Sequence, residues 1–219
     1  MTKLHNIEQR TFEWYNLRLG KITGSNFKTL ITPNGILKKD RQGNLGRTAW
    51  KTIYKAIAEE LTGLSQDDTY VTAAMEHGIE FEDEAKQEFL KHIGVDKNLN
   101  PWQDTGFATV GYLQHFGLSP DFICGEDPRE ALEIKCPTPT THVEIIHTGT
   151  IPTDWIPQAI GYFVFLEHLT TLHWCSYDYR IRKKPLVHLK IHRADWAERI
   201  KNATDSFLEV DEIINNLLK

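Results

Sequence analysis

Apolar residues recur with the 3.6-residue period of an amphipathic helix in several parts of the chain. Within residues 47–62, Trp50, Ile53, Ile57 and Leu61 fall on one face. A second long helix is predicted over 73–93, and a third at the C-terminal end. The apolar positions of this last helix alternate in steps of four and three: Trp196, Ile200, Ala203, Phe207, Val210, Ile214 and Leu217. Such a seam more often packs on a sheet than it binds a coiled-coil partner.

Shorter helices are predicted over 13–19, 23–30 and 153–168, the second of them capped by the Thr-Gly-Ser sequence at 23–25. Between and after these segments the pattern changes to short apolar runs bounded by Gly, Pro and Asp, which is typical of strands. The predicted strands are 107–113, 116–124, 131–136, 172–179 and 186–192.

This order of helices and strands predicts a mixed α/β fold built on a central sheet. The polar, glycine-punctuated stretch 32–46 is expected to be a long surface loop. No internal repeat and no linker composition stands out, so residues 1–219 are expected to form a single domain.

Composition narrows the class of protein. The chain is 40% apolar and contains six Trp, seven Tyr and ten Phe, which excludes disorder as a global description. No apolar run reaches the about 18 residues of a membrane span. The opening MTKLHNIEQR lacks the apolar region of a signal peptide, so a cytoplasmic protein is expected.

Charge and cysteine content narrow the class further. The net charge of −5 leaves no whole-protein basic footprint, so binding to nucleic acid requires local basic patches. Three cysteines without a CxxC spacing fit reduced thiols better than disulfides or a zinc site.

The candidate chemistry lies on two predicted neighbouring strands. Side chains alternate along a strand, so Glu133 and Lys135 share a face, and a hairpin brings Asp121 beside Glu133. Two carboxylates and the backbone carbonyl of Ile134 form an oxygen cage suited to Mg²⁺, with Lys135 placed to orient or deprotonate a water molecule. On spacing alone, a solvated ion pair in a hairpin is the commoner explanation.

The helix over 73–93 is acidic along its middle. Glu76, Glu80 and Glu84 share one face, whereas Glu82 lies next to the apolar side that contains Phe81. A carboxylate at a buried edge suits a second metal ion or its water, although a charge run is usually a solvated face.

Four motifs, in order, extend over nearly the whole chain. They are WYNLRLGKITGS at 14–25, GIEFEDEA at 78–85, the SPD and EIKCP sequences at 119–121 and 133–137, and WIPQ at 155–158 followed by Tyr162. Together they resemble the YqaJ viral recombinase family, which includes bacteriophage lambda exonuclease and belongs to the PD-(D/E)xK nuclease superfamily. The resemblance implies a restriction-endonuclease-like fold, with a central mixed β-sheet flanked by helices.

The resemblance also implies roles for single residues. Asp121, Glu133 and the Ile134 carbonyl would hold metal, and Glu82 would contribute to a second ion or its water. Lys135 and Gln158 would position or activate the attacking water. Arg18, Ser25 and Ser119 would form a pocket for a 5′-terminal phosphate. Without the family resemblance, a surface ion pair would explain Arg18 and a helix cap would explain Ser25.

Candidate contacts to DNA complete this set. Trp155 lies near Gln158 on one helix face, whereas core packing explains Trp14 better than base stacking does. Basic residues of the turn 180–184 and of the loop 32–46 are expected to meet the phosphate backbone: Arg180, Arg182, Lys183 and Lys184, with Lys38, Lys39 and Arg41.

The resulting hypothesis is a Mg²⁺-dependent 5′→3′ exonuclease acting on linear double-stranded DNA, with Mn²⁺ as a plausible substitute. It would release 5′-mononucleotides and leave a 3′ overhang for a single-strand annealing protein in phage or prophage recombination. The family implies a ring-shaped homotrimer. The alternatives are a restriction-like endonuclease and a non-catalytic module that binds DNA ends.

Overall fold

Short strands, separated by glycine, proline and aspartate, form two sheets. The computed structural model describes residues 1–66, 73–96 and 99–219, without the side chains of 73–75. One sheet has the order β1-β4-β5-β2 and the other β3-β6-β7-β8-β9. The strands are β1 (Thr2–His5), β2 (Ile22–Thr23), β3 (Trp102–Gln103), β4 (Phe107–Val110), β5 (Leu113–Leu118), β6 (Phe122–Cys124), β7 (Glu130–Lys135), β8 (Thr171–Tyr177) and β9 (Leu186–His192).

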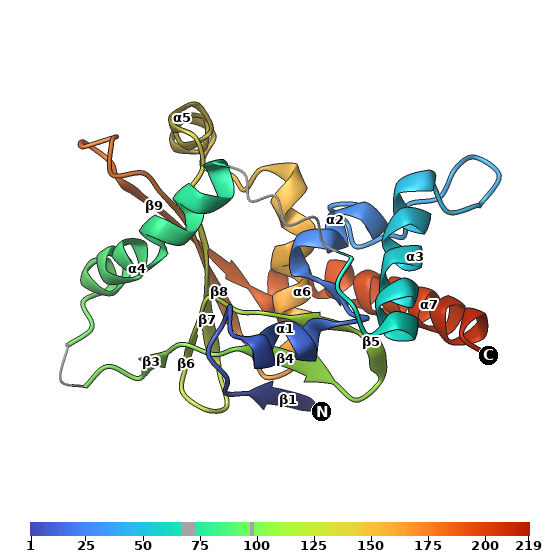
Figure 1. Ribbon diagram of the computed structural model, residues 1–219. Helices are drawn as coiled ribbons and strands as arrows, with labels where there is room; N and C mark the ends of the chain where they lie inside the picture. The colour runs from blue at the N-terminus through green and yellow to red at the C-terminus, as the bar shows by residue number, and fades with distance from the viewer. Residues whose placement is uncertain (67–72, 97–98) are drawn as a thin grey trace.

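The helices enclose these sheets and fill the space between them (Figure 1). They are α1 (Phe12–Arg18), α2 (Phe27–Leu30), α3 (Arg47–Thr62), α4 (Ala73–Ile93), α5 (Pro139–Thr148), α6 (Ile156–Phe165) and α7 (Ala197–Leu217). Short 3₁₀ turns at Gly24–Asn26, Thr153–Trp155 and Arg193–Trp196 lead into α2, α6 and α7.

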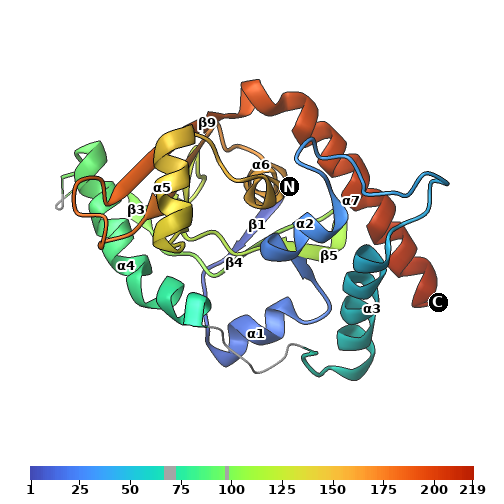
Figure 2. The same cartoon turned by 90° about the horizontal axis from the view of Figure 1, so that it is seen from above.

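Helix α6 is the centre of the molecule. It is apolar over most of its surface, as expected of a largely buried helix, and Figure 2 shows it end-on between α4 and α5 on one side and α3 and α7 on the other. Its residues join β5, β8 and α7 in the larger core. A smaller core lies between α4 and the five-stranded sheet and contains Phe89, Trp102 and Leu132.

The expected mixed α/β class is confirmed. The helices predicted over 47–62 and 73–93 have the observed bounds, and the apolar seam of α7 is buried in the larger core from Ile200 to Ile214. The central sheet is divided in two, because the chain leaves β5 at Leu118 and enters β6 in the other sheet at Phe122.

Several predicted boundaries were wrong. A turn at Gly111 and Tyr112 ends β4 early, and Ser119–Pro120 separates β5 from β6, where the sequence predicted one strand over 116–124. Helix α5 was not predicted, although Thr138 caps it and Pro139 opens it. The short strands β1, β2 and β3 were also missed.

The stretch 32–46 is a loop, as predicted, closed by two isolated bridges, Ile31 to Leu37 and Lys39 to Leu45. Gly35 has a positive φ of 77° and lies so close to α7 that a Cβ atom would meet the Arg199 carbonyl oxygen at 2.2 Å. Over the residues described, no helix is long and apolar enough to cross a membrane. The three cysteines are free thiols, as expected.

Candidate active site

Four side chains predicted from the sequence meet beside the C-terminal end of β7. Strands β6 and β7 pair antiparallel with Phe122 opposite Leu132, which brings Asp121 next to the end of β7. The Asp121 Oδ2 atom accepts a hydrogen bond of 2.7 Å from the Ile134 backbone N–H. Lys135 contacts the Glu133 carboxylate, and its Nζ atom donates a hydrogen bond of 3.0 Å to Oε1 of Gln158 on α6.

The predicted alternation along β7 is confirmed. Leu132 and Ile134 point into the smaller core under α4, whereas Glu133 and Lys135 lie on the other face. Glu133 is 1% exposed, so a solvated ion pair in a hairpin is excluded for this residue. A buried carboxylate is costly unless a cation accompanies it.

The electrostatics of the cluster show how strongly the carboxylates interact. Burial, together with the neighbouring Glu133 and Glu82 carboxylates, raises the pKa of Asp121 well above its ordinary value. Burial disfavours the charged form of Lys135, but Glu133 and Asp121 outweigh that effect and raise its pKa. The ammonium of Lys135 is therefore charged near neutral pH, which suits positioning of a water or a phosphate better than removal of a proton.

The donor set fits a hard divalent cation. Both carboxylate oxygens of Glu133 are buried, and apart from the contact with the Lys135 ammonium neither has a hydrogen-bond partner of normal geometry among the described residues. Within the described ranges, no three His, Cys, Asp or Glu side chains form a complete cage. The cation would rest on Asp121, Glu133 and the Ile134 carbonyl, and water would complete its shell, as Mg²⁺ prefers.

The predicted phosphate pocket is a cavity of about 160 Å³ that opens next to this cluster. The Arg18 guanidinium donates hydrogen bonds to Ser119 Oγ at 2.7 Å and to Thr23 Oγ1 at 3.2 Å. The Arg18 Cζ atom lies 4.0 Å from the centre of the Trp14 ring, so the guanidinium makes a cation–π contact with that ring. Residues of both sites line the cavity: Gln9, Trp14, Arg18, Thr23, Gly24, Ser25, Leu118, Ser119, Asp121 and Gln158.

Ser25 is exposed at the wall of this cavity, in the 3₁₀ turn Gly24–Asn26. Thr23 is the N-cap residue of this turn, within the expected cap at 23–25, but its side chain makes no capping hydrogen bond. Gly24 packs closely on the cluster, since a Cβ atom there would lie 3.2 Å from Cγ of Gln158. The turn that carries Ser25 and the helix that carries Gln158 are thus in direct contact.

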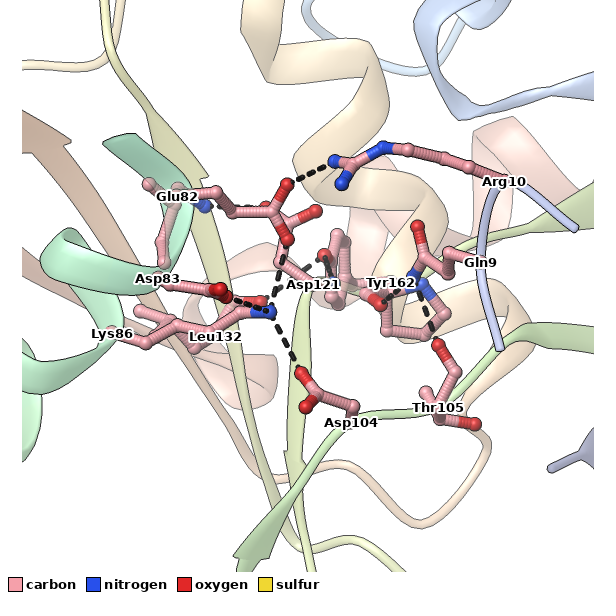
Figure 3. A network of polar contacts seen from close by, with 12 residues as sticks. Gln9, Arg10, Glu82, Asp83, Lys86, Asp104, Thr105, Asp121, Leu132 and Tyr162 are labelled. Atoms are coloured by element: carbon pink, nitrogen blue, oxygen red, sulfur yellow. Dashed lines mark hydrogen bonds and ion pairs between the residues drawn. The ribbon is translucent and has the colours of Figure 1, made fainter. Parts of the chain in front are cut away.

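Glu82 approaches the cluster from α4, as the sequence predicted, but it has cationic partners that the sequence did not indicate (Figure 3). Arg10 contacts its Oε2 atom at 2.5 Å, and Lys86 contacts its Oε1 atom at 3.0 Å. The i,i+4 spacing of Glu82 and Lys86 was a usable signal. No pattern in the sequence indicated Arg10, which is 72 residues away from Glu82.

Tyr162 was noted only as part of a motif, and the structure gives it a supporting position. Its hydroxyl accepts a hydrogen bond from the Asp121 backbone N–H at 3.1 Å and donates one to the Leu132 carbonyl at 3.2 Å. It thereby joins α6 to both strands that carry the carboxylates.

The candidate DNA contacts have different surroundings. Trp14 is 8% exposed and donates to the Gly106 carbonyl at 2.9 Å, the packing position that the sequence favoured. Trp155 is partly buried against Trp174. Arg180 is exposed but bound by two hydrogen bonds to Asp178, whereas Arg182 and Lys183 extend from the turn into solvent.

Two mixed sheets flanked by helices, with a carboxylate cluster and a lysine at the end of a central strand, define the class as a protein of the restriction-endonuclease-like fold. A family model described as the YqaJ-like viral recombinase domain matches residues 13–168. The chain belongs to this family, because the match covers more than half of its length.

Solved structures agree with this assignment. An alkaline exonuclease from Laribacter hongkongensis, LHK-Exo, is 25% identical with a TM-score of 0.71, covering 94% of this chain and 96% of that one. Its complex with dAMP matches equally well. A phage-related exonuclease from Haemophilus somnus shares the fold at 13% identity and a TM-score of 0.54, covering 90% of this chain and 96% of that one. No curated protein sequence matches.

Proposed function

We propose that the protein is a Mg²⁺-dependent exonuclease that degrades one strand of linear double-stranded DNA from its 5′ end. It releases 5′-mononucleotides and leaves a 3′ single-stranded overhang. Membership of the YqaJ-like viral recombinase family and the likeness to LHK-Exo, an alkaline exonuclease, support the nuclease role. The polarity follows from the pocket that the family resemblance assigns to a 5′-terminal phosphate.

One observation supports cleavage from a phosphorylated end: a single cavity is lined by residues of the phosphate pocket and by residues of the catalytic cluster. Arg18, Asp121 and Gln158 all line this cavity, and the Arg18 guanidinium donates a hydrogen bond to Ser119, which also lines it. A guanidinium binds phosphate oxygens through paired, charge-assisted hydrogen bonds. A terminal phosphate held by Arg18, Ser25 and Ser119 would place the adjoining phosphodiester at the carboxylates.

The catalytic roles follow from the contacts. Asp121 and Glu133, with the Ile134 carbonyl, hold the divalent cation, and Glu82 is a further ligand or water-holding group at the same edge. When bound, the cation polarises the phosphodiester and lowers the pKa of a water molecule. Lys135 donates hydrogen bonds to the water or to a phosphate oxygen, and Gln158 holds the Lys135 ammonium in place. Mn²⁺ is expected to replace Mg²⁺, since an oxygen cage accepts both.

The wider setting is proposed from the family. The overhang would pass to a single-strand annealing protein in phage or prophage recombination, inside the bacterial cytoplasm. A ring-shaped homotrimer would keep the enzyme on the duplex, with Arg182 and Lys183 among the residues that meet the backbone.

The test is digestion with Mg²⁺ of three matched DNAs: linear with a 5′-phosphate, linear with a 5′-hydroxyl, and covalently closed circular. We expect loss of the linear forms alone, fastest with the 5′-phosphate. The Arg18→Ala variant should lose this preference, with about 10- to 100-fold slower cleavage of phosphorylated ends, because a charge-assisted hydrogen bond is removed.

The matched control is Lys201→Ala, which removes one positive charge from the exposed face of α7 and should behave as the wild type. Cleavage of the closed circle would refute the exonuclease in favour of a restriction-like endonuclease. Binding of DNA ends without cleavage of any of the three DNAs would favour the alternative, a non-catalytic module that binds DNA ends.

A further inference from the structure

Arg10 has an unusual backbone conformation. Its φ is 68°, and it is the non-glycine residue with a positive φ in the part of the chain that the structure describes. A side chain with a Cβ atom rarely adopts this left-handed region unless its surroundings hold it there. We therefore looked for the contacts that hold Arg10 in this conformation and for the position that it gives to the side chain.

The cause lies in the residues on either side. The Gln9 side chain donates hydrogen bonds to the backbone carbonyls of Thr105 at 2.8 Å and Pro120 at 2.9 Å (Figure 3). On the other side, Thr11 is the N-cap of α1 and accepts a hydrogen bond from the Trp14 backbone N–H. Because both neighbours are anchored, Arg10 is forced to bridge them, and its side chain projects toward α4.

The guanidinium ends on the Glu82 carboxylate, beside Asp121 (Figure 3). It contacts Oε2 at 2.5 Å, while the Lys86 ammonium contacts Oε1 at 3.0 Å. The two cations differ in their freedom. The Lys86 side chain is 9% exposed and is also held by Asp104 at 2.7 Å, whereas the Arg10 side chain is 43% exposed.

In this arrangement Glu82 is paired with two side-chain cations, which compete with a metal ion for its carboxylate. A carboxylate paired with two cations attracts a divalent ion weakly, and Lys86 is too enclosed to leave. Arg10 can leave, because its long side chain lies at the exposed edge of the cluster. A freed guanidinium at this edge would meet the phosphate backbone of a DNA strand lying over the carboxylates.

We propose that Arg10 is a positioning residue that exchanges partners. It pairs with the Glu82 carboxylate when no divalent cation is bound, and it moves to a DNA phosphate when a divalent cation binds Glu82. This inference rests on the proposed nuclease function. It assigns Arg10 two measurable effects of opposite sign, one on binding of the cation and one on binding of DNA.

The first experiment measures Mn²⁺ binding to the DNA-free protein by electron paramagnetic resonance. Arg10→Gln should tighten Mn²⁺ binding about two- to fivefold, the range expected for loss of a competing, partly exposed ion pair. Arg10→Lys, which keeps the charge, should restore the wild-type affinity. Lys201→Gln removes an equal charge far from Glu82 and should leave the affinity unchanged.

The second experiment measures binding of a 5′-phosphorylated duplex end over a range of salt concentrations, with Ca²⁺ in place of Mg²⁺ and cleavage checked to be absent. Arg10→Gln should weaken binding and reduce the slope of log affinity against log salt by about 0.9, the effect of one lost phosphate contact. A merely structural role would not change this slope.

The results separate this proposal from the one on which it rests. If the wild type neither binds Mn²⁺ nor cleaves DNA, the nuclease function fails. If the wild type does both and Arg10→Gln matches Lys201→Gln in either measurement, the exchange is refuted. If Arg10→Gln lowers the melting temperature, the variants Glu82→Gln and Glu82→Gln/Arg10→Gln are compared instead. The proposal requires that these two variants bind Mn²⁺ equally, because Arg10 has no competing carboxylate once Glu82 is neutral.

Discussion

Two polar clusters lie on opposite faces of the five-stranded sheet at β7 and β8, and their polar atoms are paired to different extents. On the face toward α4, His173 Nε2 lies 2.6 Å from Glu130 Oε2, and His173 Nδ1 lies 2.8 Å from His188 Nε2. With both rings neutral, each N–H finds one acceptor along this chain. On the other face, Asp121 and Glu133 lie close together, and apart from the contact with Lys135 neither Glu133 carboxylate oxygen has a hydrogen-bond partner in the part of the chain that the structure describes.

The difference indicates what each cluster is for. A network in which the ring N–H groups find acceptors stabilises the fold, and Phe89 and Trp102 pack around the His173 ring as in a core. A buried cluster with surplus negative charge costs stability and is kept for binding or catalysis. Substitutions in the first cluster should therefore change stability, and those in the second should change activity.

The largest expected effect tests the carboxylate cluster. Asp121→Asn should lower kcat by at least about 10³-fold, since it removes a ligand of the cation that supplies several kcal/mol of transition-state stabilisation. Without divalent ions its melting temperature should equal or exceed that of the wild type. Asn keeps the acceptor for the Ile134 N–H and removes the repulsion from Glu133.

The sign follows from the raised pKa of Asp121. A carboxyl group with a higher pKa in the folded chain than in the unfolded chain lowers stability as pH rises through that interval. The measurements are cleavage rates with Mg²⁺ and thermal unfolding in EDTA at pH 7.5. A variant that melts well below the wild type would show that Asp121 is mainly structural.

An intermediate effect tests the histidine cluster. Burial, with the neighbouring His173 and His92 rings, lowers the pKa of His188 to about 4. The folded His188 ring then binds fewer protons than the same ring in the unfolded chain as pH falls below about 6.5, so its contribution to stability declines from there to about pH 4 and levels off below it.

His188→Gln should remove about 1–2 kcal/mol of this acid sensitivity, allowing for the partly exposed ring, and should leave cleavage at pH 7.5 unchanged. Urea denaturation at pH 7.5 and pH 4.5 provides the free energies of unfolding. If wild type and variant lose the same free energy of unfolding between pH 7.5 and pH 4.5, His188 is not the source of the acid sensitivity. If the variant no longer cleaves DNA, the histidine cluster and the carboxylate cluster do not have separate roles.

The smallest effect tests the contact between the phosphate pocket and the catalytic cluster. In Gly24→Ala the new Cβ atom would lie 2.9 Å from Leu118 Cδ1 and 3.2 Å from Gln158 Cγ. A shift of a few tenths of an ångström at Gln158 should slow cleavage about three- to tenfold, because alignment of reacting groups is sensitive to such distances.

Gly46→Ala is the matched control, since a Cβ atom there meets nothing within 4 Å. Its rate should equal that of the wild type. If Gly24→Ala cleaves DNA equally fast, the turn 24–26 and Gln158 do not depend on each other.

Much of this protein was determined by the sequence itself. The bounds of α3 and α4 and the buried seam of α7 follow from local periodicity, which a helix expresses within a few turns of chain. The alternation of Glu133 and Lys135 against Leu132 and Ile134 is also local, because successive side chains of a strand point to opposite faces. The four ordered motifs indicated the family that the family model shows.

Tertiary structure decided the rest, because it depends on residues distant in the chain. The division into two sheets and the strands β2 and β3, two residues each, exist only through pairing with partners elsewhere. The Arg10–Glu82 pair joins residues 72 apart, and the buried Glu133 lies opposite Trp174 of β8, a partner distant in the chain. Local patterns indicate which side chains are able to perform chemistry; packing sets which of them meet and which charges remain unpaired.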